Sequence, residues 1–418
     1  MRTFLFTLVA TATVVTGYYV TTGGASNPSA VAAIPPSAAA PTRPGPIPSQ
    51  LIMHEWGTFT SFSAANGVPV SFTPNNTDLP PFVYSPPSDT KAARLSQGGL
   101  VSMETPVIYF YTDKETRVSV KVDFPRGWIT EWYPYAHQAP THTARNDRTG
   151  GQSISWDVKL LPHEPARFPT DRNNSDNHYY HARATDAVPL QAEVHRSDEY
   201  NEGWLRGGTI LQREKFLFYR GVGSFPPPVT VQALGGGKVR VTNGSGGRVA
   251  GLVLVTVQDG KLGFRALGEL ENGAKMDSPL PNLDGSRTEL GELLVQQLTA
   301  AGLYEKEAKA MVKTWDSAWF GEEGSRLLYL VPRTKTDELL PLTMEPKPTD
   351  VVRVLVGRHD FLTPEQEAMA EAALKRIRAA QAELDAASAS LQKLGRFTAQ
   401  AQQIVTNRLD AKTATQKK

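Results

Sequence analysis

Four short apolar segments, separated by glycine-rich turns, constrain the fold of this chain more than any other feature. The segments are 229–233, 238–242, 249–257 and 262–267, and the turns between them are Gly-Gly-Gly, Asn-Gly-Ser-Gly-Gly and Asp-Gly. Short strands that repeat at a spacing of roughly 8–12 residues with glycine turns are typical of antiparallel sandwiches and barrels. Residues 225–270 are therefore predicted to form a sandwich-like region.

The region 51–224 carries further strand signals. Val118, Val120 and Val122 alternate with polar residues, which gives a strand one buried and one wet face. Residues 163–210 interrupt this pattern with prolines and polar side chains. Because they offer too few apolar residues for a core of their own, we expect a long polar excursion over the sheet rather than a separate domain.

After residue 270 the apolar residues follow a helical period. Ser286 and Glu289 form a capping box before one apolar face, and Gly302 stands where a left-handed C-terminal residue belongs. A second stripe carries Trp315 and Trp319, which we expect in the core. Residues 271–362 are thus predicted to form a helical hairpin that returns to sheet.

The C-terminal part, 363–410, is predicted to be helical. Thr363-Pro364-Glu365-Gln366 combines an N-cap, a proline at the first helical position and a capping-box glutamine. This signal starts a long helix that runs toward Leu394 and docks on the body, and 411–418 is expected to be a disordered tail. The predicted fold class is α+β, mostly antiparallel β and sandwich-like, with a helical hairpin and a long C-terminal helix.

The N-terminus predicts export. Arg2 precedes an uncharged apolar run from Phe4 to Val20, and Ala30-Val31-Ala32 offers a small-x-small cleavage site. Residues 1–32 are therefore a signal peptide or, because the run nearly reaches bilayer-spanning length, an uncleaved anchor. Residues 33–50 contain six prolines and are predicted to be a Pro/Ala-rich linker. We expect a periplasmic, cell-surface or secreted protein that meets a membrane only through this N-terminal segment.

The composition and motifs of the sequence argue against several classes of function. The chain has no cysteine, so it has no disulfide, no thiol nucleophile and no thiolate-ligated zinc. The formal net charge is +2 without a basic stripe, which disfavours nucleic acid as a partner. The glycine runs lack the Lys-Ser/Thr of a phosphate loop, and no G-x-S-x-G nucleophile elbow occurs.

A metal site would have to use nitrogen and oxygen ligands. Six of the eight histidines fall between residues 128 and 220, and another opens the segment His54-Glu55-Trp56. The candidate ligands for a divalent ion such as zinc are His54, Glu55 and His178. His181 is excluded as a second ligand beside His178 because the stretch resembles a strand, on which the two would face opposite sides. A structural hydrogen-bonding role for His54 or Glu55 is the main alternative.

Two carboxylates lie next to aromatic runs. Glu104 and Glu131 are the candidate catalytic pair, because glycoside hydrolysis needs one acid and one base or nucleophile. The candidate binding residues are aromatic rings that could stack on a sugar: Trp56, Trp128, Trp132 and Tyr133. The alternative is that the rings near Glu131 cap the edge of the core.

Several long segments resemble an uncharacterised family of exported bacterial proteins. The segments span nearly the whole folded body: HEWGTFTSF (54–62), METPVIYFYT (103–112), VKVDFPRGWITEWYP (120–134), EKFLFYRGVGSF (214–225), WFGEEGSRLLYLVP (319–332) and RVLVGRHDFLTPEQE (353–367). The resemblance implies export and a single integrated fold. It implies no activity, substrate or catalytic residue.

Two functional interpretations follow. The first is a non-catalytic binding or structural protein of the cell envelope that uses exposed tryptophan and tyrosine to hold an extracellular glycan or a protein partner. The second is a hydrolase of an extracellular polymer, with or without a divalent metal. The first is preferred because no dyad, triad or metal motif has a recognisable spacing, and whether the protein is an enzyme stays open.

Overall fold

The computed structural model describes residues 50–72, 79–85, 101–140, 151–195, 209–379 and 384–416. All of them belong to one compact unit, Ala39–Lys418. The predicted signal peptide or anchor, and all of the linker except its last residue, lie outside these ranges. No helix in the described ranges is both long and apolar enough to cross a membrane.

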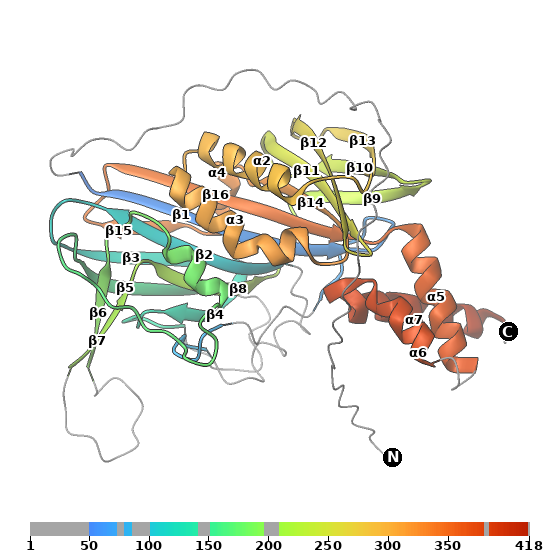
Figure 1. Ribbon diagram of the computed structural model, residues 1–418, viewed down its shortest axis with the longest axis horizontal. Helices are drawn as coiled ribbons and strands as arrows, with labels where there is room; N and C mark the ends of the chain where they lie inside the picture. Colours follow the sequence, from blue (N-terminus) through green and yellow to red (C-terminus); the bar gives the residue numbers. More distant parts are fainter. Residues whose placement is uncertain are drawn as a thin grey trace, which may run out of the picture. The chain divides into compact units, whose positions relative to one another are not determined.

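An eight-stranded sheet, here called the main sheet, organises this unit (Figure 1). In order across the sheet, its strands are β12 (Lys261–Leu270), β11 (Val249–Gln258), β14 (Gly324–Leu330), β16 (Asp350–Phe361), β1 (Ile52–Ser63), β2 (Val101–Tyr111), β8 (Leu217–Gly223) and β4 (Gly127–Tyr133). β1 and β16 pair in parallel, and all other pairings of the named, described strands are antiparallel.

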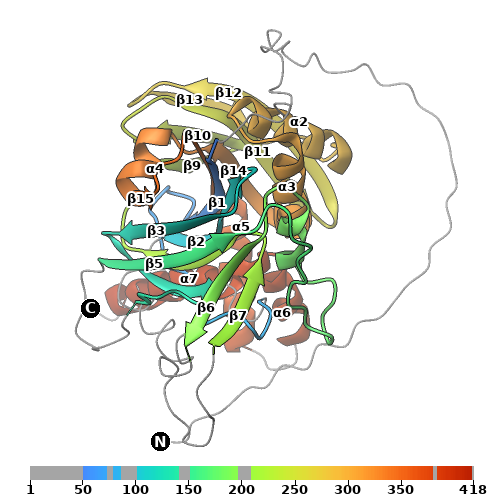
Figure 2. The same cartoon turned by 90° about the vertical axis from the view of Figure 1, so that its left-hand side faces the viewer.

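Two smaller sheets accompany the main sheet (Figure 2). The five-stranded sheet has the order β15 (Leu342–Glu345), β3 (Thr116–Phe124), β5 (Gln152–Leu160), β6 (Leu190–His195) and β7 (Thr209–Glu214). The three-stranded sheet has the order β13 (Lys275–Pro279), β10 (Lys238–Asn243) and β9 (Val229–Gly235). One apolar core contains Phe59 of the main sheet, Val120 of β3 and Val241 of β10. Both small sheets therefore pack on the same face of the main sheet, which we call the sheet-packed face.

The four strands predicted at 225–270 all form, but they pair as two separate hairpins that lie in different layers. β9 and β10 belong to the three-stranded sheet, whereas β11 and β12 form one end of the main sheet. Val231 and Val241 of the first hairpin share a core with Leu252 and Leu254 of the second. The region is thus sandwich-like, and β13 and β14 from later in the chain complete its two layers.

Helices cover the other face of the main sheet, here called the helix-bearing face. α2 (Arg287–Ala300) and α3 (Glu305–Phe320) form the predicted hairpin, and their apolar residues share a core with Trp56 and Val107. The Ser286 side chain accepts a hydrogen bond from the Glu289 N–H, and Gly302 has φ +111°. The expected burial of Trp315 and Trp319 is confirmed. A short helix, α4 (Arg333–Leu339), connects β14 to β15.

The C-terminal part folds as several helices. These are α5 (Pro364–Ala379), α6 (Leu384–Gln392), the 3₁₀ turn η3 (Gly395–Phe397) and α7 (Thr398–Gln416). Thr363 and Gln366 form the expected reciprocal cap. The predicted C-terminal helices form, but the helix that begins at Pro364 does not run on to Leu394, because α5 and α6 pack against each other as separate helices. Their apolar side chains pack together and against Phe62 and Leu362. The helix α7 also continues through 411–416, where a disordered tail was expected.

Candidate functional site

The aromatic residues expected to bind a ligand lie in the core. The exposed fractions of Trp56, Trp128, Trp132 and Tyr133 are 0%, 1%, 8% and 4%. They stand on β1 and β4 of the main sheet, both of whose faces are covered along these strands. The prediction of an exposed aromatic binding face is therefore wrong. The alternative of a core role holds for the rings near Glu131, and Trp56 lies in the core as well.

His54 is buried and fixes the start of α3 to the main sheet. Its Nδ1 lies 2.8 Å from Oε2 of Glu307, which is itself fully buried. Glu307 also accepts hydrogen bonds from the Tyr111 hydroxyl at 2.7 Å and from the Tyr304 N–H at 2.7 Å. Both carboxylate oxygens are thus used, and His54 takes the structural hydrogen-bonding role that was the alternative to metal binding.

Glu55 points to the sheet-packed face, opposite to His54, because successive strand residues alternate. Its two oxygens accept hydrogen bonds from the Tyr219 hydroxyl at 2.5 Å and from Nε of Arg353 at 2.5 Å. Burial and the adjacent Glu55 carboxylate raise the pKa of Tyr219 well above its ordinary value. Glu55 therefore holds a buried cation in place and faces away from any ligand that His54 could share.

His178 lies near neither His54 nor Glu55. It begins the 3₁₀ helix η1 (His178–Arg183) rather than the strand expected there, since the side chain of Asn177 caps the turn by accepting from the Tyr179 N–H. The His178 ring stacks on Trp315 at 6.0 Å.

The three proposed metal ligands do not meet. Glu307, the partner of His54, and Trp315, the partner of His178, are eight residues apart on α3, which is about 12 Å along a helix. Glu55 is on the other face of the sheet. Within the described ranges no group of three His, Asp or Glu side chains is arranged as metal ligands would be. His54, Glu55 and His178 do not fit a common zinc site.

The structure does bring Glu104 and Glu131 to one level of the main sheet. Met103, the residue before Glu104, pairs with Gly221 of the antiparallel strand β8, so Glu104 lies level with Arg220. Glu131 of β4 pairs with Arg220 from the other side. The two carboxylates and Arg220 thus lie on three neighbouring strands, on the helix-bearing face, and all three are buried. Thr60 donates to Glu104 at 2.9 Å, and Thr130 donates to Glu131 at 2.5 Å.

This polar row continues across the sheet as an ion-pair network. Arg358 and Arg326 both bind Asp360, at 2.6 Å and 3.1 Å. Arg326 also donates to the carbonyls of Ala318 and Trp319, so it closes the C-terminal end of α3. Burial, reinforced by Arg358, lowers the pKa of Arg326 to about 10. One nitrogen of Arg358, Nη1, has no hydrogen-bond partner among the described residues.

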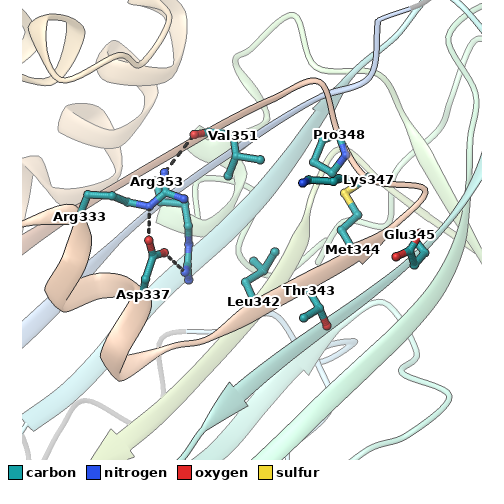
Figure 3. A pocket seen from close by; sticks show the side chains of 10 residues that line it. All are labelled: Arg333, Asp337, Leu342, Thr343, Met344, Glu345, Lys347, Pro348, Val351 and Arg353. Atoms are coloured by element: carbon teal, nitrogen blue, oxygen red, sulfur yellow. Dashed lines mark hydrogen bonds and ion pairs between the residues drawn. The ribbon is translucent and has the colours of Figure 1, made fainter.

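A cavity of about 320 Å³ opens on the sheet-packed side, between α4, β15 and the beginning of β16 (Figure 3). Its lining combines charged and apolar side chains and contains no aromatic ring. The lining residues are Arg333, Asp337, Leu342, Thr343, Met344, Glu345, Lys347, Pro348, Val351 and Arg353. We call this cavity the Arg353 pocket.

Arg353 gives the Arg353 pocket its chemistry. The side chain is only 1% exposed, and its Nε and Nη1 donate to Glu55 and to Asp337, the latter at 2.7 Å. Its Nη2 is buried and has no hydrogen-bond partner among the described residues. Burial alone would lower the pKa of Arg353, but the Glu55 carboxylate outweighs it and the pKa is raised, so the guanidinium stays charged.

Two further cations stand at the same pocket. Arg333 binds Asp337 at 2.8 Å and donates to the Val351 carbonyl at 3.0 Å, as the dashed lines of Figure 3 show. Lys347 is exposed, and the described part of the chain offers it no ion-pair partner. A guanidinium with a spare donor beside an apolar wall suits a carboxylate attached to an apolar group.

None of the residues that give the Arg353 pocket its charge was a candidate from the sequence. A signal was nevertheless present, because Arg353 interrupts the aliphatic run Val351 to Val356. An arginine inside a buried strand must find an acidic partner, since burying an unpaired charge is very costly. Its acidic partner, Glu55, is 298 residues away in the chain.

Comparison with known proteins gives no family for this chain. No family model matches it, and no curated protein matches it. Among solved structures, the yeast delta-COP-I mu-homology domain complexed with a Dsl1 WxWxV peptide is similar with a TM-score of 0.27 at 7% identity, covering 76% of this chain and 100% of that one. The yeast delta-COP-I mu-homology domain alone gives a TM-score of 0.27 at 6% identity, covering 77% and 100%. Likeness at this level carries no inference about fold or function.

Proposed function

We propose that this chain is an exported, non-catalytic binding protein of the cell envelope, and that the Arg353 pocket takes a carboxylate-bearing ligand. The observation that carries the proposal is Arg353, which lines the cavity and whose Nη2 is buried and has no hydrogen-bond partner among the described residues. Leaving such a donor without a partner costs about 1–3 kcal/mol, and more when the group is charged. A ligand carboxylate would remove this cost.

The rest of the Arg353 pocket supports a small amphipathic ligand. Apolar surface comes from Leu342, Met344, Pro348 and Val351. The exposed ammonium group of Lys347 lines the same pocket and can pair with an anion. The volume is at the lower end of the range of roughly 300–1,000 Å³ that is usual for ligand pockets. The pocket therefore suits the end of a molecule or one small group.

A pair of ligands that differ only in charge tests the proposal. N-acetyl-leucine should bind the full chain in titration calorimetry, whereas N-acetyl-leucinamide should not, because it lacks the carboxylate. Lys347→Gln should weaken binding about two- to five-fold, as expected for a partly solvated ion pair. The matched control is Lys335→Gln on α4, which does not line the pocket and should bind as the unaltered chain does. Equal binding of the amide, or binding of neither ligand, would overturn the proposal.

Export has its own test. Residues 1–50, fused to a reporter, should carry it out of the cytoplasm, because the apolar run and the proline-rich segment resemble an export signal followed by a spacer. A reporter that stays wholly in the cytoplasm would contradict this part of the proposal.

A second candidate function is a hydrolase built on the row Glu104, Arg220 and Glu131. It is favoured by one observation, the placement of two buried carboxylates on one face at one level of the sheet. Two such groups are what the cleavage of a glycosidic bond requires. Release of reducing ends from extracellular polysaccharides, lost in both Glu104→Gln and Glu131→Gln, would support it. No release by the unaltered chain would count against it.

A further inference from the structure

The strand β15 borders the Arg353 pocket along its edge. All four residues of the strand, Leu342 to Glu345, line the cavity. Side chains of a strand alternate between its two faces, so four consecutive residues reach one cavity only when the cavity runs along the strand's edge. The backbone of β15 therefore faces the space in which the ligand would lie.

That edge is open in the described part of the chain. β15 is the end strand of the five-stranded sheet and pairs only with β3, from Leu342 opposite Val122 to Glu345 opposite Ser119. The outer N–H and C=O groups of an end strand can pair with another extended chain. Only a short ligand segment can pair here, because β15 has four residues.

We infer that the ligand of the Arg353 pocket is the C-terminal end of an extended peptide, which pairs with the open edge of β15 and places its terminal carboxylate on Arg353. This inference rests on the proposed carboxylate-binding function. Arg353 and Lys347 provide the positive charge that a terminal carboxylate needs. Met344 and Val351 provide an apolar site for the last side chain.

The lining of the pocket favours a peptide over an acidic glycan. Sugars are commonly held by stacking on aromatic rings, and none of the ten lining residues is aromatic. The described tryptophans that could have served, Trp56, Trp128 and Trp132, are buried. A strand edge beside a cation offers what an extended peptide needs, namely backbone pairing and a place for the charge.

The test uses the full chain and acetyl-Thr-Val-Thr-Val-Leu with a free carboxylate. Titration calorimetry should show this peptide binding at least ten-fold tighter than N-acetyl-leucine, because backbone pairing adds to the carboxylate contact. Two N-methyl analogues, methylated at adjacent residues, should differ. One should lose about ten-fold in affinity and the other should lose little, because only alternate N–H groups of a paired strand face the partner.

A second readout locates the peptide. Amide hydrogen exchange of 342–345 should slow when the pentapeptide is bound, but not when N-acetyl-leucine is bound. The matched control is β7, the other end strand of the same sheet, whose exchange should not change. If the pentapeptide and N-acetyl-leucine bind equally and exchange at β15 is unaffected, peptide pairing is wrong and the carboxylate pocket stands. If neither compound binds, the proposed function itself fails.

Discussion

Arg326 and Arg353 are buried arginines on adjacent strands of the main sheet, and their guanidinium groups are satisfied to different degrees. Arg326, on the helix-bearing face, uses all three nitrogens, because it binds Asp360 and donates to two backbone carbonyls at the end of α3 and to two in the turn that follows. Arg353, on the sheet-packed face, uses two nitrogens, and its Nη2 has no partner among the described residues.

The difference separates a structural ion pair from the proposed binding site. A buried charge with every donor used has nothing left to offer a ligand, so Arg326 contributes to folding alone. Arg353 keeps one donor and lines a cavity, so it stabilises the fold through Glu55 and, in the proposed function, offers Nη2 to a ligand. Both arginines are buried, so burial does not distinguish them. They differ in the number of guanidinium nitrogens that have a hydrogen-bond partner.

The largest expected effect is on stability, at Arg326. Arg326→Met should destabilise the protein by about 3–5 kcal/mol, because Asp360 and the carbonyls of α3 lose a buried partner. Urea unfolding measures the change. The control is Arg240→Met, which breaks an exposed pair with Asp277 and should alter stability far less. Similar losses in the two variants would show that the Arg326 network is not structural.

His359 should make the stability depend on pH. Burial lowers the pKa of this histidine to about 4, and it lies between the hydroxyls of Ser61 and Ser63. The unfolded chain gains the proton near pH 6.5, whereas the folded chain gains it only near pH 4. The unfolded state therefore binds more protons between these values, and stability should fall by about 3 kcal/mol as pH falls through that window.

Urea unfolding at pH 7 and pH 4 of the unaltered chain and of His359→Gln measures this contribution. The variant should be less stable at pH 7 but should lose less of its stability on acidification. An identical pH dependence in the two proteins would contradict the buried, neutral state of His359.

A variant of Tyr219 tests whether ligand binding at Arg353 depends on the hydrogen bond between Tyr219 and Glu55. Tyr219→Phe removes the hydroxyl that donates to Glu55 and should destabilise the protein by about 1–2 kcal/mol. Glu55 keeps its bond to Arg353, so N-acetyl-leucine affinity should change less than two-fold. A large loss of affinity with little loss of stability would show that Tyr219 acts on the pocket directly.

Local signals in the sequence predicted much of the fold. The caps at Ser286 and Thr363, the turn at Gly302 and the glycine turns at 225–270 each act within a few residues, so the elements they bound were predictable. The 3₁₀ helix at His178 was missed because the Asn177 cap is a weak signal in a stretch rich in tyrosine and histidine.

The site could not be predicted, because it depends on long-range pairing. β1 and β16 are almost 300 residues apart in the chain and pair in parallel, which places Glu55 opposite Arg353. The alternation of side chains along β1 places His54 and Glu55 on opposite faces of the main sheet. However, only the layers on both sides of the main sheet show that the aromatic rings of β1 and β4 are enclosed rather than exposed.

The role of Arg353 is tested most directly by combining one change in the ligand with one change in the protein. N-acetyl-leucine and N-acetyl-leucinamide are titrated into the unaltered chain and into Arg353→Lys, whose lysine can still neutralise Glu55 but lacks the spare Nη2 donor. We expect the preference for the carboxylate to fall by about ten-fold or more in the variant, because a charged hydrogen bond is lost. An undiminished preference in a folded Arg353→Lys protein would contradict the central role of Arg353.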